Sequence, residues 1–512
     1  MDSSIVFKLF SSNTVFILLP CVLLTLIMLL VEKKSKKNFS DEAFVKRAPG
    51  PMSLPILGNL YSMAGYELPY QSFGVLAKKF GDIINLKLGP QQAVVVNGID
   101  NIKEVLIAKS SHFDSRPNFK RYHDLFSGNK ENSLAFCNWS DIQKKRRDML
   151  VQHSFPRNFS LRFNQLNDII ANQMQSTICD VKTKIADNQL IAIKPLMLQS
   201  CANIFTQYFC SRSFSTTDKG FQKMIYNFDK IFYEVNQGYL ADFFPVLLPL
   251  FHSRNLKRME NWSHEIRQFI LDNIIENRKD TWTASNEQSD YVDSLVDHVT
   301  QNLEPKMEWE TALFALEDII GGHSAVGNFL VKVFGYIVQN QHVLKKIQQE
   351  VDETIECKQG NSTIELSDRN QMPYTEAVIM EALRMIASPI VPHVANQNST
   401  VGGYFVEKDT LIFLNNYELS MSEELWVNPK EFNPERFIRD GRVFKPDFFL
   451  PFGAGRRSCM GYKLVQYLSF SILTNLLQTF DVTTIDGGKI TVEAGNLAVD
   501  EKSFEFKFKE RC

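Results

Sequence analysis

The chain has 512 residues, of which 44% are hydrophobic, and its formal net charge is −2. A chain of this length buries a large core, and a near-neutral charge argues against nucleic-acid binding as the main function. The eight cysteines are widely scattered and include no CxxC pair, so we expect neither a disulfide framework nor a zinc site, and most are expected to be free thiols in a reducing compartment.

The N-terminus predicts a membrane anchor over residues 1–37. Residues 15–31, VFILLPCVLLTLIMLLV, carry no charge and as a helix would cover roughly 25 Å, just short of a hydrocarbon core. Most of the flanking positive charge follows this segment, in Lys33, Lys34, Lys36 and Lys37. A cleaved signal peptide has the reverse order, and a mitochondrial presequence is Arg-rich and amphipathic. A retained anchor is therefore favoured, and the positive-inside rule places the rest of the chain in the cytoplasm.

Residues 38–55 are expected to link the anchor to the globular body. This stretch is polar at first and then contains Pro49, Pro51 and Pro55. Prolines at this density cannot continue a helix and favour extended, stiff backbone. The sequence therefore predicts a hinge before a single body over residues 56–512.

The body is mostly helical in pattern, with a few short β elements. Ile83–Leu88 and Ala93–Val96 are rich in β-forming residues, and Gly89-Pro90 between them predicts a hairpin. Further short extended pieces are expected near 389–413. Long amphipathic helices are predicted over residues 139–152, 161–185, 221–236, 257–278, 309–340, 342–357, 373–386 and 462–480. The fold class is therefore mainly α with small β-sheets.

The segment PFGAGRRSCMGYKL, residues 451–464, surrounds one cysteine with three glycines and two arginines. A thiolate that binds a metal needs its charge stabilised and its bond shielded from water. The glycines let the backbone turn tightly and approach a flat partner. Arg457 is placed to reach an anionic group on that partner, and a helix that opens at Tyr462 adds the dipole of its N-terminus. Haem held through the sulfur of Cys459 meets these requirements; the alternative is an incidental buried cysteine in a glycine-rich loop.

The pattern Phe452-x-x-Gly455-x-Arg457-x-Cys459-x-Gly461 resembles the haem-binding signature of the cytochrome P-450 family. Two companion elements precede it in the right order. Glu381-Ala-Leu-Arg384 resembles the ExxR pair of the family's helix K, whose spacing sets both charges on one helical face. Residues 433–437, NPERF, resemble the PERF element, which implies that Arg436 joins that pair in a buried network. The resemblance covers residues 47 to 512.

Shorter matches extend the resemblance. They are the proline hinge, residues 113–117 (FDSRP), residues 403–405 (GYF) and Pro392-His393. The last of these resembles the strand position at which a His or Arg bonds a haem propionate, which implies that role for His393. An ordinary strand histidine is the alternative.

The predicted helix over 139–152 departs from the family's helix C. That helix usually carries WxxxR, whose arginine bonds a propionate, but Trp139 is followed four residues later by Gln143. Trp139 and Arg146 are seven residues apart, about two turns, and so share a face of the predicted helix. We therefore expect Arg146 to replace the missing arginine. The basic run Lys144 to Arg147 is either a face for an acidic redox partner or simply solvated surface.

The predicted helix over 309–340 departs from the family's helix I, which carries A/G-G-x-D/E-T with an acid–alcohol pair for proton relay. Gly321 and Gly322 are present, where a widened turn would leave room for oxygen. Ser324 replaces the acid and Ala325 replaces the threonine. Ser324 either holds a water or simply bonds the i−4 carbonyl, and His323 is expected to point away from the haem.

Residues 321–328, GGHSAVGN, are similar to the same segment of the Spook type among the Halloween-group cytochromes of arthropod ecdysteroid synthesis. That subgroup also lacks the helix I threonine. The similarity implies a sterol substrate and a role in the early oxidation of 7-dehydrocholesterol.

The resemblance as a whole implies a single-pass, membrane-anchored haem-thiolate monooxygenase of the endoplasmic reticulum with a cytoplasmic catalytic domain. It implies haem b with Cys459 as the axial iron ligand, O2 as co-substrate, and electrons from NADPH through a partner reductase. The protein is expected to be monomeric and to bind an apolar substrate and no nucleic acid. Substrate-facing residues are expected in 115–135 and 232–250, although packing or membrane contact explains the aromatic second stretch equally well.

Three other functions remain open at this point. One is a haem-thiolate isomerase or dehydratase that does not use O2, since such enzymes can lack the acid–alcohol pair. The others are a monooxygenase of foreign compounds and a haem-binding carrier or sensor. The dependence of product formation on NADPH and reductase separates a monooxygenase from an isomerase and from a carrier.

Overall fold

The computed structural model describes residues 46–511 except Glu67, Pro69 and residues 239–241, 246–252, 280–288, 359–362 and 501–503. The predicted anchor and residues 38–45 of the predicted linker lie outside the described residues. Within the described part of the chain, no helix is long and apolar enough to cross a membrane.

Helices make up most of the fold, as the sequence predicts. They are α3 (Gln71–Phe80), α4 (Ile99–Lys103), α5 (Lys120–Leu125), α6 (Asp141–Ser154), α7 (Leu161–Ala186), α8 (Ile193–Cys210), α9 (Lys219–Val235), α11 (Ser253–Ile270), α12 (Glu276–Lys279), α13 (Tyr291–Thr300), α14 (Trp309–Gln339), α15 (Gln341–Glu356), α16 (Pro373–Ile386), α17 (Asn416–Met421) and α18 (Tyr462–Thr479).

The strands are short and form small sheets. They are β1 (Ile83–Leu88), β2 (Gln91–Val96), β3 (Ile191–Ala192), β4 (His393–Val394), β5 (Ser399–Val401), β6 (Tyr404–Val406), β7 (Leu411–Leu414), β8 (Ile438–Arg439), β9 (Arg442–Val443), β10 (Phe480–Thr483) and β11 (Glu505–Glu510). The largest sheet has the order β1-β2-β7-β4, and β2 pairs with β7 in parallel. The predicted hairpin is confirmed, since β1 and β2 pair antiparallel on either side of Gly89, whose φ of +60° suits glycine.

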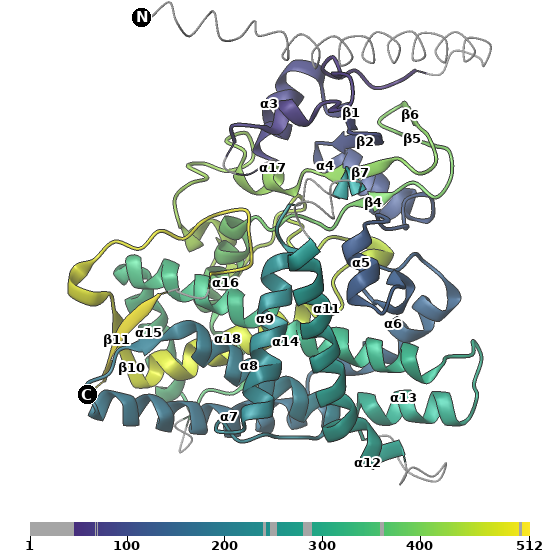
Figure 1. Cartoon of the computed structure of the whole chain (residues 1–512). Coiled ribbons are helices and arrows are strands. Elements are labelled where there is room, and N and C mark those ends of the chain that lie inside the picture. The colour runs from purple at the N-terminus through teal and green to yellow at the C-terminus, as the bar shows by residue number, and fades with distance from the viewer. Residues whose placement is uncertain are drawn as a thin grey trace, which may run out of the picture.

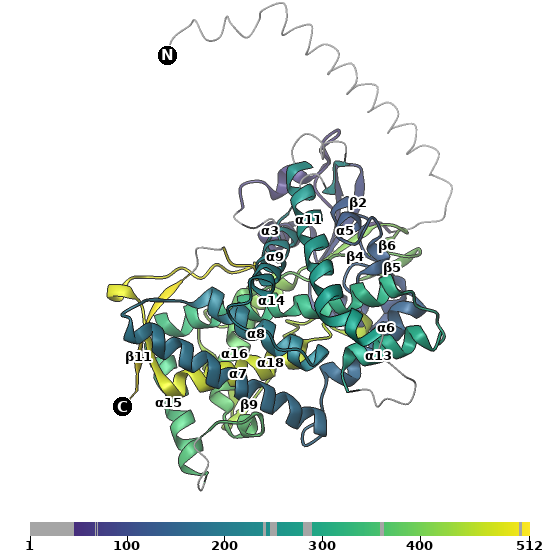
Figure 2. The same cartoon turned by 60° about the horizontal axis from the view of Figure 1, so that its bottom comes forward.

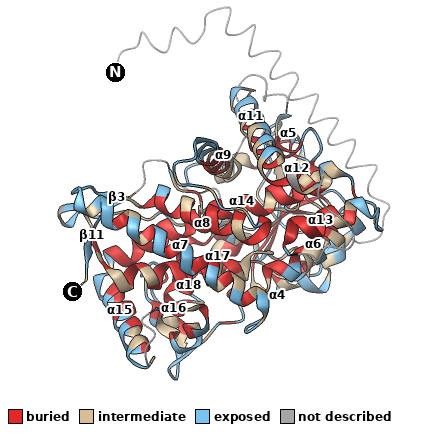
Figure 3. Cartoon of the chain, turned by 90° about the horizontal axis from the view of Figure 1, so that it is seen from below, coloured by how far each residue is buried: buried red, intermediate tan, exposed pale blue. Residues whose placement is uncertain are grey.

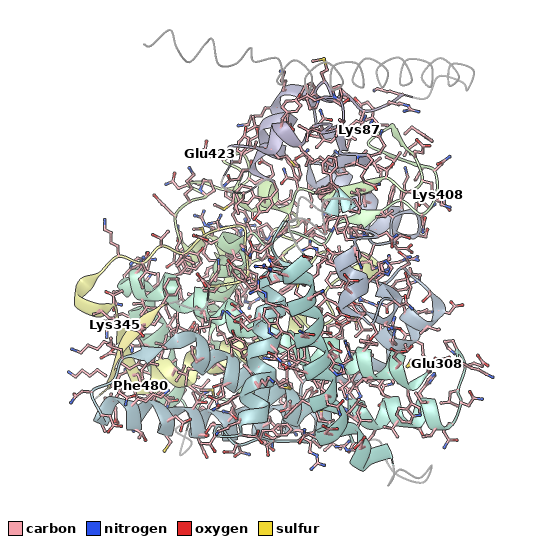
Figure 4. The ribbon with its side chains drawn as sticks, viewed as in Figure 1. Lys87, Glu308, Lys345, Lys408, Glu423 and Phe480 are labelled. Carbon is pink, nitrogen blue, oxygen red and sulfur yellow. The ribbon has the colours of Figure 1, made fainter. Side chains whose placement is uncertain are left out.

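The elements gather into two regions. The β1-β2-β7-β4 sheet, with α3 and α17, forms the upper part of Figure 1, and the long helices α7, α8, α14 and α18 form the lower part. The view in Figure 2 shows α14 at the centre, with α8 beside it and α15 at one edge. Charged side chains such as Lys345, Lys408 and Glu423 lie at the periphery (Figure 4).

Helix α14 is the centre of the core. It is buried over most of its length because its sequence is apolar on almost every side, and α8 packs along it (Figure 3). The sequence did not predict α8, because its burial on nearly every side leaves no polar stripe to reveal a helical period.

The predicted helices agree with the structure except in their bounds, and one difference in bounds matters. Helix α6 begins at Asp141, and the hydroxyl of Ser140 caps it by accepting a hydrogen bond from the Gln143 amide (3.1 Å). Trp139 therefore precedes the helix. The argument that Trp139 and Arg146 share a helical face is wrong for this reason.

Candidate functional site

The loop that carries Cys459 turns through two glycines in left-handed backbone. Gly453 and Gly455 both have φ of +68°, and a Cβ on Gly455 would collide with the carbonyl of Leu106. The amide of Cys459 donates to the carbonyl of Phe452 (3.0 Å), and α18 begins three residues after the cysteine, at Tyr462. The sequence predicted this arrangement of tight turn, thiol and helix N-terminus.

We infer an internal hollow beside the thiol of Cys459. The residue lies deep within the molecule and yet is exposed. Burial raises the pKa of the thiol, while a hydrogen bond from the Gly461 amide and the charge of Arg147 act in the opposite direction. A thiol in this position is retained as a thiolate when a metal cation lies against it. The loop therefore fits a haem iron ligand.

Helix α14 has one face that neighbouring residues cover only in part, and we call it the uncovered face. Asp318, Gly321, Gly322 and Ala325 are half-buried at positions i, i+3, i+4 and i+7, whereas Ile320, His323 and Ser324 are buried. Positions with this spacing share one face of a helix. We infer that this face and Cys459 border the same hollow, since α14 and α18 pack against each other.

Ser324 does not lie on that face. Its hydroxyl is fully buried and lies 3.4 Å from Nε2 of His323, whose Nδ1 donates to the carbonyl of Ile320 (2.6 Å). Burial lowers the pKa of His323 to about 4, so the ring is neutral, and it packs edge-on against Phe228. His323 points away from the hollow as predicted, but the suggestion that Ser324 holds a water there is not supported by its placement.

The glycines of this helix serve close packing. A Cβ on Gly321 would lie 2.9 Å from the ring of Phe228 in α9, and one on Gly322 would lie 3.0 Å from the ring of Phe205 in α8. The backbone stays α-helical from Trp309 through Gln339, so the expected widened turn is not observed.

Buried positive charge gathers at the edge of the hollow. Arg457 donates to the carbonyls of Asp114 (Nε, 2.9 Å) and Cys137 (2.7 Å), and its guanidinium lies 5.4 Å from the ring of Trp139. Arg116 donates to the carbonyls of Ala135, Val391 and Pro392. Burial and the charge of Arg457 lower the pKa of Arg116 to about 9. Arg116 belongs to the segment FDSRP, which matches the family pattern, but the sequence alone did not assign this arginine a role.

His393 adds an unpaired ring nitrogen to this cluster, which donates only when the ring is protonated. Its Nδ1 lies 2.6 Å from the carbonyl of Phe113, and its buried Nε2 has no hydrogen-bond partner among the described residues. Burial, and then the charge of Arg116, lower its pKa well below the usual value. We call Arg116, Arg457, His393 and Trp139 the cationic cluster. Excess buried charge with an unpaired nitrogen fits an anionic partner such as the two propionates of haem.

Arg146 lies elsewhere. Its guanidinium is buried and donates to the carbonyls of Glu131, Asn132 and Ser133. Its neighbour Arg147 instead donates to the carbonyl of Ser458 (2.8 Å), beside the thiol. The structure therefore speaks against Arg146 as the replacement in helix C and places Arg147 near the loop. The basic run is also split, because Lys144 is exposed while Arg146 points inward.

Glu381, Arg384 and Arg436 form a second charged group. Glu381 accepts two hydrogen bonds from Arg384 (2.7 Å each) and one from Nε of Arg436 (3.1 Å). Arg384 also donates to the carbonyl of Ser420 (2.7 Å). We call these three residues the carboxylate network. Glu381 and Arg384 are fully buried, as the resemblance implied.

The predicted substrate-facing stretches lie partly within the described residues. Phe243 packs edge-on against Phe119, and Arg121 of α5 forms a buried ion pair with Asp242 (2.9 Å). These contacts hold the described part of 232–250 against the 115–135 segment. The remainder of that stretch, residues 239–241 and 246–250, lies outside the described residues.

This fold and this thiol loop define a haem-thiolate protein, and comparison with known proteins agrees. A family model described as Cytochrome P450 matches residues 48–508. Cytochrome P450 307a1 of Drosophila melanogaster is 38% identical over 500 residues, covering 93% of this chain and 91% of the relative. The chain belongs to the cytochrome P450 family, and it is a monooxygenase.

More distant relatives cover nearly as much of the chain. The steroid 17-alpha-hydroxylase/17,20 lyase of Felis catus is 29% identical over 89% of this chain and 91% of its own length. Cytochrome P450 1A5 of Gallus gallus is 27% identical over 91% of this chain and 89% of its own length.

Proposed function

We propose that this monooxygenase oxidises a sterol in ecdysteroid synthesis. The observation that carries the proposal is Ala325 on the uncovered face of α14, in a segment similar to the Spook type. The 38% identity to Cytochrome P450 307a1 and the steroid-hydroxylating relatives support a sterol substrate.

Each part of the site has a role in this proposal. Haem b, when bound, would supply the chemistry that activates oxygen, and Cys459 would hold its iron. Arg116, Arg457 and His393 would bind its propionates, with Trp139 beside Arg457. The loop of Phe452, Gly455 and Gly461 shields the thiolate from water.

Proton supply is the step for which this chain lacks the family's usual residues. Ala325 has no hydroxyl and Ser324 is buried on another face of the helix. General acid relay typically contributes about 10²–10⁴-fold in rate. We propose that a hydroxyl of the substrate, or a water that it holds, delivers the protons. A narrow substrate range follows, because the correct substrate completes the site.

Sterol binding tests the proposed function directly. The haem-loaded protein is titrated with a panel of sterols that includes 7-dehydrocholesterol, while the spin-state shift of the Soret band is followed. Products formed with NADPH and reductase are then identified by mass spectrometry. A sterol that shifts the spin state and is oxidised only with NADPH supports the proposal. Turnover without NADPH would instead indicate an isomerase, and sterols that neither bind nor react would refute it.

A deoxy analogue of the substrate tests the proton hypothesis. Removal of the hydroxyl should leave binding largely intact but divert electrons from NADPH to hydrogen peroxide. The measured quantity is product formed per NADPH consumed. An analogue that couples as well as the native sterol would show that the substrate hydroxyl is not needed.

We also propose that residues 1–37 anchor the protein in the endoplasmic reticulum membrane, with the body in the cytoplasm where a reductase reaches it. Deletion of residues 1–37 should release much of the protein from microsomes and preserve haem binding, because the site residues all lie beyond the hinge. Import into mitochondria with cleavage of the N-terminus would contradict this location.

A further inference from the structure

An irregular segment between α5 and α6 is held by side chains from two different helices. Residues 131–135, which we call the clamped segment, begin within a single turn of 3₁₀ helix at Lys130–Asn132. Arg146 of α6 donates to the carbonyls of Asn132 (2.6 Å), Glu131 (3.0 Å) and Ser133 (3.3 Å). The backbone acceptors of this segment are thus bound by one guanidinium.

The donors of the same segment are bound from the opposite side. Asp318 of α14 accepts a hydrogen bond from the hydroxyl of Ser133 (3.0 Å) and another from the amide of Leu134. The hydroxyl of Ser133 in turn accepts from the amides of Ala135 (3.0 Å) and Phe136 (3.1 Å). The carboxylate of Asp318 therefore binds donors of the clamped segment, and the guanidinium of Arg146 binds three of its carbonyls.

Gln143 completes this arrangement. Its Nε2 donates to the carbonyl of Leu134 (2.7 Å), and its side chain is fully buried. Gln143 stands at the position four residues after Trp139, where the family's helix C carries its arginine. In this chain, Gln143 and Arg146 both bind the clamped segment.

We infer that the clamped segment borders the hollow, because it is bound by Asp318 of α14 on one hand and by Arg116 of the cationic cluster on the other, which donates to the carbonyl of Ala135 (3.1 Å). Ala135 is exposed, whereas its neighbour Ser133 is fully buried. Asp318 belongs to the uncovered face of α14 that also holds Gly322 and Ala325.

We propose that Asp318 and Arg146 are positioning residues that fix the clamped segment as a rigid wall and thereby determine how tightly large apolar ligands bind. Charge-assisted hydrogen bonds from both sides give a short irregular segment a single conformation. The proposal rests on the haem enzyme assigned above but does not depend on which substrate it takes.

Two iron ligands of different size test this role in the haem-loaded, full-length protein. Imidazole is small, whereas clotrimazole carries three aryl rings that contact the walls of the hollow. Both are titrated while the Soret shift is followed. Asp318→Asn and Arg146→Gln should each reduce the preference for clotrimazole over imidazole by about tenfold, because each loses charge-assisted hydrogen bonds to the wall. The affinity for imidazole itself should not change.

Two further readouts separate a positioning role from general damage. Amide hydrogen exchange of a peptide covering residues 131–136 should be faster in both variants. The double variant should show little further loss beyond either single variant, since the two residues act on the same segment.

Glu350 offers a matched control. It accepts hydrogen bonds from the amides of Tyr374 and Thr375 (2.8 Å each) and from the hydroxyl of Thr375 (2.7 Å). The chemistry resembles that of Asp318, but α15 lies at the side of the molecule away from α6 (Figures 1 and 2). Glu350→Gln should leave the clotrimazole-to-imidazole ratio unchanged.

Each outcome decides the proposal. A ratio within about twofold of the wild type in both variants overturns it, as does an equal loss of both ligands, which would place the effect at the haem. If Asp318→Asn does not fold, Ser133→Ala removes the hydroxyl alone, and an unchanged ratio there overturns the proposal. No sterol is used, so failure of the sterol assignment leaves this test intact.

Discussion

The carboxylate network and the cationic cluster differ in how their buried charges are matched. In the carboxylate network, Glu381 meets two guanidinium groups and the amide of Asn433, so opposite charges lie against each other within the chain. In the cationic cluster, Arg116 donates to backbone carbonyls, Arg457 donates to backbone carbonyls and to the sulfur of Cys137 (3.9 Å), and Nε2 of His393 is unpaired among the described residues. The first group is complete as folded, and the second becomes complete when it holds an anion. Guanidinium groups that a carboxylate of the chain binds directly belong to the structure here, whereas those of Arg116 and Arg457, which no described carboxylate binds directly, fit a site for an anion.

The largest expected effect is on the carboxylate network. Glu381→Gln removes the charge that two buried guanidinium groups face, which should cost about 3–5 kcal/mol. That is a large part of the roughly 5–15 kcal/mol by which a protein is stable. We expect little folded protein, measured as soluble yield and as the midpoint of thermal unfolding.

A neighbouring surface change provides the control for that variant. Glu435 belongs to the same PERF element as Arg436 and forms an exposed ion pair with Lys346 of α15. Glu435→Gln should leave the unfolding midpoint almost unchanged, because exposed ion pairs contribute little. Equal midpoints for Glu381→Gln and Glu435→Gln would break the distinction between the two groups.

The second prediction concerns the thiol of Cys459. Cys459→Ser should abolish activity and the strongly red-shifted Soret band of the reduced carbon monoxide complex, because the axial thiolate is lost. Cys137→Ser should retain that band. A Soret band at the position typical of imidazole ligation in undamaged wild-type protein would contradict the assignment.

The third prediction concerns a change that should affect haem binding more than the stability of the fold. His393→Phe in the cationic cluster removes one hydrogen bond to Phe113, worth about 1 kcal/mol, and replaces an unpaired buried nitrogen by carbon. Haem-free protein should therefore unfold at nearly the same temperature as the wild type, while haem should dissociate several times faster. The loss is followed by transfer of haem to apomyoglobin. Unchanged haem release would argue that His393 is an ordinary strand residue.

The fourth prediction uses pH on a less well matched acid. Glu317 lies 3.4 Å from Arg267, and burial raises its pKa to about 8. A carboxyl whose pKa is raised in the folded state keeps its proton between about pH 4.5 and 8, so its contribution to stability falls as the pH rises through that window. Glu317→Gln does not titrate. The unfolding midpoint of the variant should therefore rise relative to that of the wild type between about pH 5 and pH 8. A constant difference between the two midpoints would show that Glu317 is already ionised.

The smallest expected effect is at the helix that faces the hollow. Ala325→Thr restores the family's hydroxyl but should change product formed per NADPH by less than about twofold, because proton supply depends on the substrate. Ser324→Ala, on the buried side, is the matched control and should have no effect on coupling. A large gain from Ala325→Thr would show that the missing threonine limits the enzyme.

The sequence by itself determined the class of the fold, the ligand loop and the pairing of Glu381 with Arg384. Each of these depends on local pattern: hydrophobic periodicity for the helices, glycines around Cys459, and the i,i+3 spacing of Glu381 and Arg384. The place of Arg436 in the carboxylate network was implied by the resemblance to the family, since it lies 55 residues from Glu381. The sequence did not predict helix α8, because its burial on nearly every side removes the polar part of the helical pattern.

Only the tertiary structure decided which polar side chains face the hollow. Adjacent residues of α14, Ser324 and Ala325, differ in burial because one helical step rotates a side chain by about 100°. The side chains of Arg146 and Arg147 point in different directions for the same reason. Arg146 binds the clamped segment, and Arg147 binds the thiol loop. The meeting of Asp318 with Ser133, 185 residues apart in the chain, depends on how α14 packs against a distant loop, and no local pattern encodes such a contact.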